Sequence, residues 1–424
     1  MKIFTRYAWV AVLLLPLAAC GGGGGGSSSS GGGGGGGSTP PPINQVAIVA
    51  NAGVVNDYTN GLFTSVTVCV PGTTNCTTVD NVLVDSGSYG LRLLDSALAS
   101  LPLKFNNAPD GKPLGECTAY VATYNWGPVA NADVKLGGET AANVPVQVMG
   151  VSGFPGAPSA CTAGGLTEND TQQSLGANGI LGVGVFRYDC GGACSSDQGG
   201  DPKNIPPIYF SCPSTGCTAA LIPLAEEVQN PVSVFPQDNN GELITLPAVP
   251  ASGAISAKGT MTFGIGTQSD NQLTGEVVLG ADGYGNFQTA FQGKTYYNFS
   301  QAIGSVIDSG SNANFFLDAT TLNITQCTGG NSGFYCPGGT SPISYTATNL
   351  SADGTTSITA AWDVADAQTL FNTGNWAFDN LAGPNPGSFD FGLAFFFGKT
   401  VVIGLNGAQA KSNGTTHVGP FYGY

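Results

Sequence analysis

Apolar and polar positions alternate along much of the chain beyond residue 43. Residues 62–68 and 144–148 show the period of two that places every second side chain on one face of a strand. Short apolar runs at 277–279 and 401–403 end next to a glycine, which is typical of buried strands. The pattern therefore predicts strands through most of the chain.

Helical patterns are rare in the same region. Only residues 219–228 and 318–322 have a spacing that suits a short helix. The chain has 424 residues, 65 of them glycine, and only 9% are charged. This composition disfavours helical bundles and favours a β-rich protein outside the cytoplasm. Apolar residues make up 42%, so at this length we expect an all-β, bilobal fold with few short helices, its lobes spanning 43–240 and 241–424.

The first twenty residues have the features of a targeting segment. Lys2 and Arg6 precede an apolar run that is too short to span a membrane. The run ends in Leu-Ala-Ala-Cys, which resembles the lipobox of bacterial lipoproteins. The resemblance implies a signal peptide over 1–20 and acyl chains such as palmitate on Cys20. Gly21, rather than an acidic residue, follows the cysteine, which implies the outer membrane. An ordinary signal peptide with a chance cysteine is the alternative.

Residues 21–42 form a segment of low complexity. Glycine and serine fill most of it and three prolines close it, so we expect a flexible tether. Glycine-rich runs also occur in phosphate-binding loops. Here no strand precedes the run and no Lys-Ser or Lys-Thr follows it, which excludes that interpretation.

The charge balance excludes several classes of function. The chain has 12 basic and 27 acidic residues, and two of the basic ones lie in the leader. It therefore lacks the basic surface that nucleic-acid binding needs. The single histidine, His417, cannot supply a zinc site with two or three histidines. No Gly-x-Ser-x-Gly motif precedes it for a serine hydrolase triad. We expect no metal and no cofactor.

The cysteines indicate an oxidising compartment. Ten of them follow Cys20, an even number that predicts five disulfides. A metal cluster is the alternative, but no C-x-x-C motif and no nearby histidine supports it. Four pairs are close in sequence, and two cysteines remain: Cys69 and Cys76, Cys190 and Cys194, Cys212 and Cys217, Cys327 and Cys336, with Cys117 and Cys161 left over.

A repeated tetrapeptide is the most informative pattern. Asp85-Ser86-Gly87-Ser88 follows the apolar residues 82–84, and Asp308-Ser309-Gly310-Ser311 follows residues 305–307. In each half, an apolar strand thus delivers an aspartate into a tight turn. A carboxylate at a strand end is held rigidly, and glycine leaves room for a second backbone to approach. We expect the two turns to lie together.

Such a pair of aspartates has a defined chemistry. Two carboxyl groups in contact cannot readily both ionise, so Asp85 and Asp308 would share one proton. One can then act as base on a water molecule while the other acts as acid on a substrate carbonyl.

With these motifs the chain resembles, distantly, the pepsin-like, two-lobed aspartic proteases. The resemblance covers most of residues 43–410. It implies a catalytic pair and the residues that support it: Asp85 and Asp308 as the pair, Ser86 and Ser309 bonding across the lobes, Ser88 and Ser311 bonding the outer oxygens, and Gly87 and Gly310 in the turns.

Two further features of that family have counterparts here. Each lobe of the family carries an apolar strand with glycine beneath its aspartate, and residues 179–184 and 389–396 resemble these strands. The family also has a hairpin flap with a tyrosine, which implies that Tyr124 and Trp126 belong to a flap over the substrate cleft. Trp126 packed in the core is the alternative.

Arg92 departs from the family pattern, which usually has tryptophan seven residues after the first aspartate. A cation near the cleft would lower the pKa of Asp85 and favour the fully ionised, inactive pair. A solvated residue on a strand is the alternative. Only the tether precedes the first strand, so we also expect no inhibitory prosegment.

Together these features predict an aspartic-type endopeptidase of the bacterial cell envelope that acts on extended peptide or protein substrates. We expect a monomer, anchored to the membrane through its N-terminal lipid. The alternative is a pepsin-fold envelope lipoprotein without activity, with a peptide-binding or structural role, because a fold does not determine a function.

Overall fold

The computed structural model describes residues 44–412 and 414–424. The expected signal peptide, the tether and Cys20 lie outside these residues. Strands dominate the described chain, and its α-helices are each four or five residues long. The expected all-β fold with few short helices is therefore confirmed.

One sheet of 16 strands runs through both halves of the molecule, 44–240 and 241–424. Strand β6 pairs with β2 as well as β7, so part of the sheet closes on itself. The strands of this sheet are β1 (Gln45–Asn51), β2 (Gly61–Cys69), β3 (Cys76–Asp85), β4 (Tyr89–Leu94), β5 (Leu114–Ala119), β6 (Thr123–Leu136), β7 (Glu139–Met149), β8 (Thr167–Glu168), β9 (Gly179–Val183), β10 (Tyr209–Ser211), β11 (Thr218–Ala219), β12 (Gly241–Leu246), β13 (Ala257–Phe263), β14 (Val278–Gly280), β23 (Lys399–Gly404) and β26 (Phe421–Gly423).

Smaller sheets complete the C-terminal half. One has the order β16–β15–β19–β20, one the order β17–β22–β18–β21, and β24 pairs with β25. Their strands are β15 (Gln288–Phe291), β16 (Lys294–Tyr296), β17 (Ser305–Ile307), β18 (Asn314–Leu317), β19 (Ile343–Leu350), β20 (Ser357–Val364), β21 (Ala382–Gly383), β22 (Asn385–Phe391), β24 (Gln409–Ser412) and β25 (Thr415–Val418). Of the four runs expected to be strands, 62–68, 144–148 and 401–403 lie in β2, β7 and β23, and 277–279 overlaps β14 at residues 278–279.

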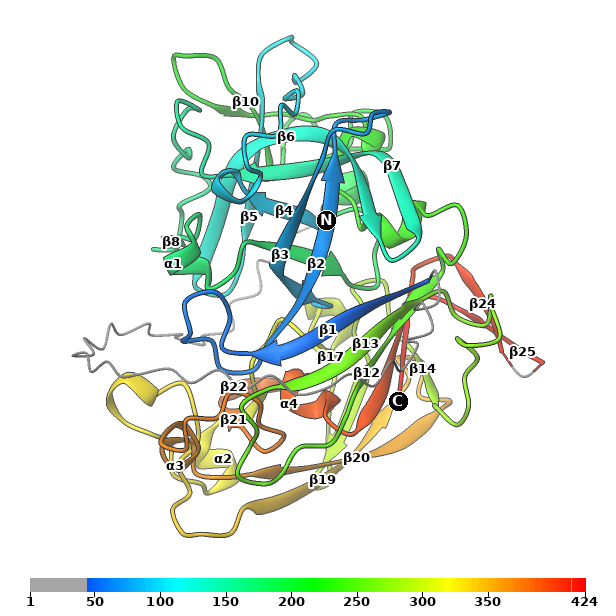
Figure 1. The fold of residues 1–424 in the computed structure, drawn as a ribbon. Coiled ribbons are helices and arrows are strands. Elements are labelled where there is room, and N and C mark those ends of the chain that lie inside the picture. The colour runs from blue at the N-terminus through cyan, green and yellow to red at the C-terminus, as the bar shows by residue number, and fades with distance from the viewer. Residues whose placement is uncertain (1–43, 413) are drawn as a thin grey trace, which may run out of the picture.

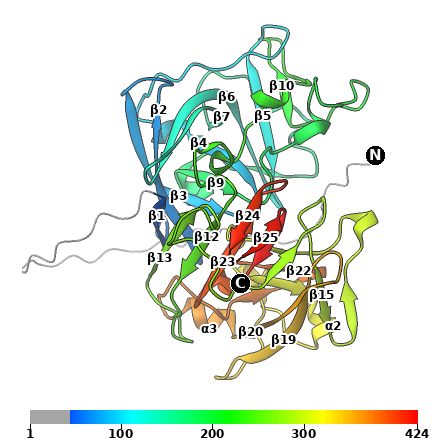
Figure 2. The same cartoon turned by 90° about the vertical axis from the view of Figure 1, so that its right-hand side faces the viewer.

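The two halves are joined through the middle of the large sheet. Strand β1 pairs with β13 in antiparallel register, with Val49 opposite Lys258, and β13 pairs with β12. Figure 1 shows most N-terminal strands above these three and most C-terminal strands below them. In the view of Figure 2, the β24–β25 hairpin lies at the level where the halves meet. Backbone hydrogen bonds therefore connect the halves directly.

The helices are α1 (Gln172–Leu175), α2 (Ala319–Leu322), α3 (Ala367–Phe371) and α4 (Leu393–Phe396). The short helix expected at 318–322 is confirmed as α2. It begins after Asp318 because the side chain of Asp318 caps it by accepting a hydrogen bond from the N–H of Thr321. The prediction of a helix at 219–228 is wrong. Pro223 interrupts that segment, which forms the end of β11 and one 3₁₀ turn instead. No helix in the described parts of the chain is long and apolar enough to cross a membrane.

Each half buries an apolar core beneath its aspartate-bearing strand. Val84 precedes Asp85 and Ile307 precedes Asp308, and both are fully buried in the main apolar cluster. The C-terminal part of this cluster is rich in aromatic rings, with Phe316 in edge contact with Trp362 at 5.0 Å between centroids. The strands that end in the two motifs are therefore fixed by packing.

The five expected disulfides are confirmed, and they join the cysteines that are close in sequence and the two left over. Cys117 and Cys161 link β5 to the segment after β7. The others close short loops: Cys69–Cys76, Cys190–Cys194, Cys212–Cys217 and Cys327–Cys336.

Candidate active site

The first Asp-Ser-Gly-Ser motif begins at the end of β3, within the large sheet. Strand β3 pairs in parallel with β9, and its last residue, Asp85, lies opposite Gly182. A methyl group on Gly182 would lie 2.6 Å from the backbone nitrogen of Tyr89, so glycine is required where β4 begins beside β9. Asp85 is 6% exposed, and its carboxyl group is carried by a packed strand end.

The second motif is held in a related way. Asp308 follows β17, which pairs in parallel with β22. The backbone N–H of Asp308 donates to the carbonyl of Phe391 at 3.0 Å. Gly392 follows Phe391 in the chain, as Gly182 follows Leu181 in β9, the strand beside the first aspartate. The two halves therefore present their aspartates through the same local arrangement.

Two serines bind the motifs to each other. The N–H of Ser86 donates to Oγ of Ser309 at 3.1 Å, and the N–H of Ser309 donates to Oγ of Ser86 at 2.8 Å. The Ser86 hydroxyl in turn donates to the carbonyl of Ile307, and the Ser309 hydroxyl to that of Val84. Both serines are buried. These reciprocal bonds fix the position of one turn relative to the other.

The carboxyl groups receive matching hydrogen bonds. Oδ1 of Asp85 accepts from the N–H of Gly87 at 2.8 Å, and Oδ2 accepts from the Ser88 hydroxyl at 2.5 Å. Oδ1 of Asp308 accepts from the N–H of Gly310 at 2.8 Å, and its Oδ2 lies 3.0 Å from Oγ of Ser311. These partners come from each aspartate's own motif.

Each carboxyl group also lies against the glycine of the other motif. A methyl group on Gly87 would lie 2.5 Å from Cγ of Asp308, and one on Gly310 would lie 2.6 Å from Cγ of Asp85. Any side chain at these glycines would collide with the opposite aspartate. The motif glycines therefore permit the close approach of the two carboxyl groups.

Burial and proximity control the protonation of the pair. Burial raises the pKa of Asp308 well above its usual range, and repulsion by Asp85, the charge of Asp390 and a hydrogen bond with Asp85 add to the rise. The N–H of Gly310 opposes it. Asp308 therefore keeps its proton to a higher pH than a free aspartic acid does.

Two tyrosines lie near the pair. Tyr120 is in the turn of the β5–β6 hairpin, with its hydroxyl beside Ser88, and Tyr58 is in the loop between β1 and β2. Burial raises the pKa of both hydroxyl groups, and the charge of Asp85 adds to the rise in each. Both tyrosines therefore stay protonated beside the aspartates. The sequence analysis identified neither.

The structure does not place Tyr124 and Trp126 at the aspartates, and this corrects the sequence-based assignment. Tyr124 pairs with Ala119 across the hairpin and packs in a buried cluster around the Cys117–Cys161 disulfide. Trp126 lies in the same cluster and donates its indole N–H to the carbonyl of Pro155 at 2.7 Å. The hairpin turn falls at residues 120–122, which include no glycine, proline, asparagine or aspartate to mark it.

Arg92 is neither solvated nor free to act on the aspartates. It is fully buried, and its Nη2 pairs with Glu116 at 2.5 Å and with Asp189 at 2.9 Å. Its Nε donates to Thr118, one residue along β5 from the Cys117 disulfide. The guanidinium therefore holds two buried carboxyl groups, and it fastens strand β5 of the β5–β6 hairpin to β4.

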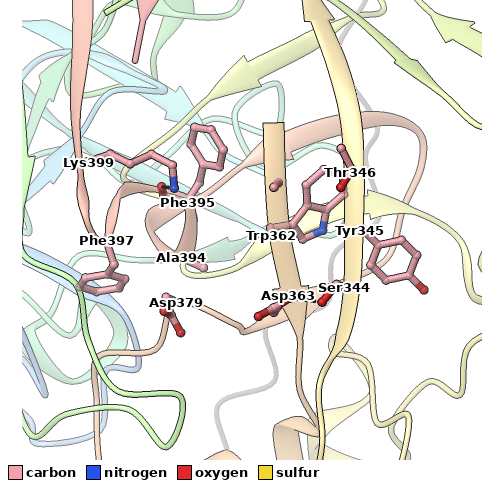
Figure 3. A pocket seen from close by; sticks show the side chains of 11 residues that line it. Ser344, Tyr345, Thr346, Trp362, Asp363, Asp379, Ala394, Phe395, Phe397 and Lys399 are labelled. Atoms are coloured by element: carbon pink, nitrogen blue, oxygen red, sulfur yellow. Dashed lines mark hydrogen bonds between the residues drawn. The ribbon is translucent and has the colours of Figure 1, made fainter. Parts of the chain in front are cut away.

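A separate cavity of about 300 Å³ lies in the C-terminal half. Figure 3 shows Trp362 and Tyr345 of the β19–β20 hairpin on one side of it, with Lys399 and Asp379 on the other. None of the residues that line it belongs to either Asp-Ser-Gly-Ser motif. The candidate active site is therefore the paired motifs and the tyrosines beside them.

Comparisons with known proteins cover most of the chain. The comparison with curated proteins finds no match. Among solved structures, the chain is similar to an aspartic proteinase from Irpex lacteus, with 14% identity, a TM-score of 0.45, and 89% of this chain and 96% of that one covered. A family model described as "Protein of unknown function (DUF3443)" matches residues 40–424. The chain therefore belongs to the DUF3443 family.

Proposed function

We propose that this protein is an aspartic-type endopeptidase in which Asp85 and Asp308 act as a general acid–base pair. The observation that carries the proposal is the close approach of the two carboxyl groups, each against the glycine of the other motif. The reciprocal bonds of Ser86 and Ser309 support it, because they hold both groups in one fixed geometry.

The proposed roles follow from the different surroundings of the two carboxyl groups. Asp308, whose pKa burial raises, carries the shared proton. Asp85 is then the carboxylate of the pair, with Gly87 and Ser88 as hydrogen-bond donors to its oxygens. Asp85 removes a proton from water as its oxygen attacks the peptide carbonyl carbon, and Asp308 gives its proton to the carbonyl oxygen. Asp85 then gives its proton to the amide nitrogen while Asp308 takes a proton from a hydroxyl group of the resulting diol. The C–N bond breaks, and one proton remains on Asp308 as at the start.

The substrate we propose is an extended peptide with apolar side chains beside the cleaved bond. An extended chain can pair with strand edges through its backbone. The hairpin turn over the pair carries Val121, which is 54% exposed, next to Tyr120. An apolar substrate side chain would cover this surface and exclude water from the aspartates.

Peptide hydrolysis by the full-length protein in detergent tests the proposal. A library of unstructured peptides is incubated at pH values from about 3 to 8, and new termini are identified by mass spectrometry. We expect cleavage next to apolar residues, best at mildly acid pH where the pair holds one proton. The absence of cleavage throughout this range would contradict the proposal and favour the inactive, peptide-binding or structural alternative.

We also propose that the protein is a lipoprotein of the cell envelope. The support is the lipobox ending at Cys20 and the disulfides, which form in oxidising compartments. Replacement Cys20→Ser should abolish incorporation of labelled palmitate and release the protein from the membrane fraction. A Cys20→Ser protein that still incorporates palmitate would place the acyl chain elsewhere.

A further inference from the structure

The two halves of the candidate site differ at one equivalent position. In the first half, Ile180 lies two residues before Gly182 and is buried in an apolar cluster that Tyr58 and Tyr120 contact. In the second half, the residue two positions before Gly392 is Asp390. A carboxyl group therefore lies next to the second aspartate where the first has an aliphatic side chain.

The Ser311 hydroxyl connects Asp390 to Asp308. Its Oγ lies 3.0 Å from Oδ2 of Asp308 and 2.6 Å from Oδ2 of Asp390. The matching hydroxyl in the first half, Ser88, bonds Oδ2 of Asp85 and no second carboxyl oxygen among the described residues. A serine hydroxyl has one proton, so Ser311 cannot donate to both carboxylates at once.

Two arrangements of protons satisfy the Ser311 hydroxyl. In the first, Ser311 donates to Asp390, its shorter contact, and its oxygen accepts a bond from a protonated Oδ2 of Asp308. In the second, a protonated Asp390 donates to Ser311 and Ser311 donates to Asp308, which leaves Asp308 negatively charged against the carboxyl group of Asp85. The position of Asp308 between Asp85 and Asp390 therefore favours a proton on Asp308 and a negative charge on Asp390.

We propose that Asp390 is a positioning residue that, through Ser311, holds the shared proton on Asp308 and so makes Asp308 the acid and Asp85 the base. This inference rests on the proposed peptidase function for its catalytic meaning. It predicts that the pair keeps its proton, and hence its activity, to a higher pH than it would without Asp390.

The charged surroundings of Asp390 agree with this role. The neighbouring strands β17 and β18 have no titratable side chains. Among the described residues, the titratable groups that interact around the site from other elements include Asp308, Asp85, Tyr58 and Tyr120. Repulsion from Asp390 is among the causes that raise the pKa of Asp308, after burial and Asp85.

The test follows the Asp308 carboxyl group directly, by ¹³C NMR of full-length protein with labelled aspartate. The Asp308 signal is the one missing from Asp308→Asn. We expect the titration midpoint of Asp308 to fall by about one pH unit in Asp390→Asn. The midpoint should fall by a similar amount in Asp390→Ile, because isoleucine is the residue at the equivalent position of the first half, Ile180. Asp363→Asn, an exposed aspartate of β20, is the matched control and should leave the midpoint unchanged.

The pH profile of kcat/KM gives the catalytic readout. Its alkaline limb should move to lower pH in Asp390→Asn by the same amount as the Asp308 midpoint, whereas Asp390→Glu should restore part of the shift. An unchanged Asp308 midpoint in folded Asp390→Asn or Asp390→Ile protein would overturn the inference. If wild type cleaves no peptide, the proposed function fails, but the NMR titration still decides the role of Asp390.

Discussion

The hydroxyl groups of Ser86 and Ser309 each accept one hydrogen bond and donate another across the two motifs. Replacing either by alanine leaves a buried N–H of the other motif without its acceptor. We expect Ser86→Ala and Ser309→Ala each to lower the free energy of unfolding by about 1–3 kcal/mol. Urea denaturation measures this loss.

The exposed Ser65 serves as the control for these substitutions, because its hydroxyl bonds only the exposed Asp80. Ser65→Ala should cost less than about 0.5 kcal/mol. The double variant Ser86→Ala/Ser309→Ala should cost less than the two single changes added together, because both remove parts of one network. Additive costs would show that the two serines act independently.

At this scale, the motif residues could be predicted from the sequence because their roles are local. Gly87 must be small and Ser88 must lie three residues after Asp85 wherever the rest of the chain goes. Asp390 and Tyr120 could not be identified in this way. The strand at 389–396 is expected beneath the second aspartate, but the role of Asp390 depends on its contact with Ser311, which strand pairing alone does not specify. The role of Tyr120 depends on where the β5–β6 turn falls, and the nearby sequence does not mark that turn.

Strand β5 of the β5–β6 hairpin depends on a buried charge cluster. Glu116 of β5 and Asp189 both pair with Arg92, and burial raises the pKa of Asp189 well above its usual range. Arg92→Trp would leave these carboxyl groups buried without their cation. We expect Arg92→Trp to lower the free energy of unfolding by about 3–5 kcal/mol at neutral pH, as measured by urea denaturation.

The matched variant replaces the whole cluster. Arg92→Trp combined with Glu116→Gln and Asp189→Asn removes the uncompensated charges and should recover much of the loss. The single variant should also be less impaired at acid pH, where the carboxyl groups are protonated. A stable Arg92→Trp protein with higher peptidase activity would instead show that Arg92 acts on the catalytic pair.

Most elements around the site could be predicted because alternation and apolar runs are local signals. The strands that end in the motifs carry such runs, and the Asp318 cap identifies α2. The pairing of these elements could not be predicted. The contact of β1 with β13 joins residues about 200 positions apart, and no local pattern specifies so distant a partner.

Buried carboxyl groups give the whole molecule a distinctive pH dependence. Burial raises the pKa of Glu227 to about 8 and the pKa of Glu242, Asp189 and Asp308 well above their usual range. The native state therefore keeps protons that the unfolded chain loses above about pH 4. The free energy of unfolding should fall as the pH rises from about 5 to 8.

Exposed carboxyl groups do not obscure this trend. Hydrogen bonds from Ser351 and Thr355 lower the pKa of Asp353 to about 2, so its contribution is lost only in acid below about pH 4. Urea denaturation at about pH 5 and 8 measures the slope. Glu227→Gln should reduce it, whereas the exposed Asp57→Asn should not. A stability that rises over this range would show that these carboxyl groups are ionised in the native state.

The kcat/KM of Asp308→Asn, measured against wild type on the best peptide from the library, tests the central claim most directly. Asparagine keeps the shape of the side chain but cannot carry the shared proton. We predict a loss of at least about a thousandfold, with native stability retained, and the same loss in Asp85→Asn because the two act as a unit. Asp95→Asn, an exposed aspartate after β4, should retain full activity. An Asp308→Asn protein that cleaves as fast as wild type would contradict the account.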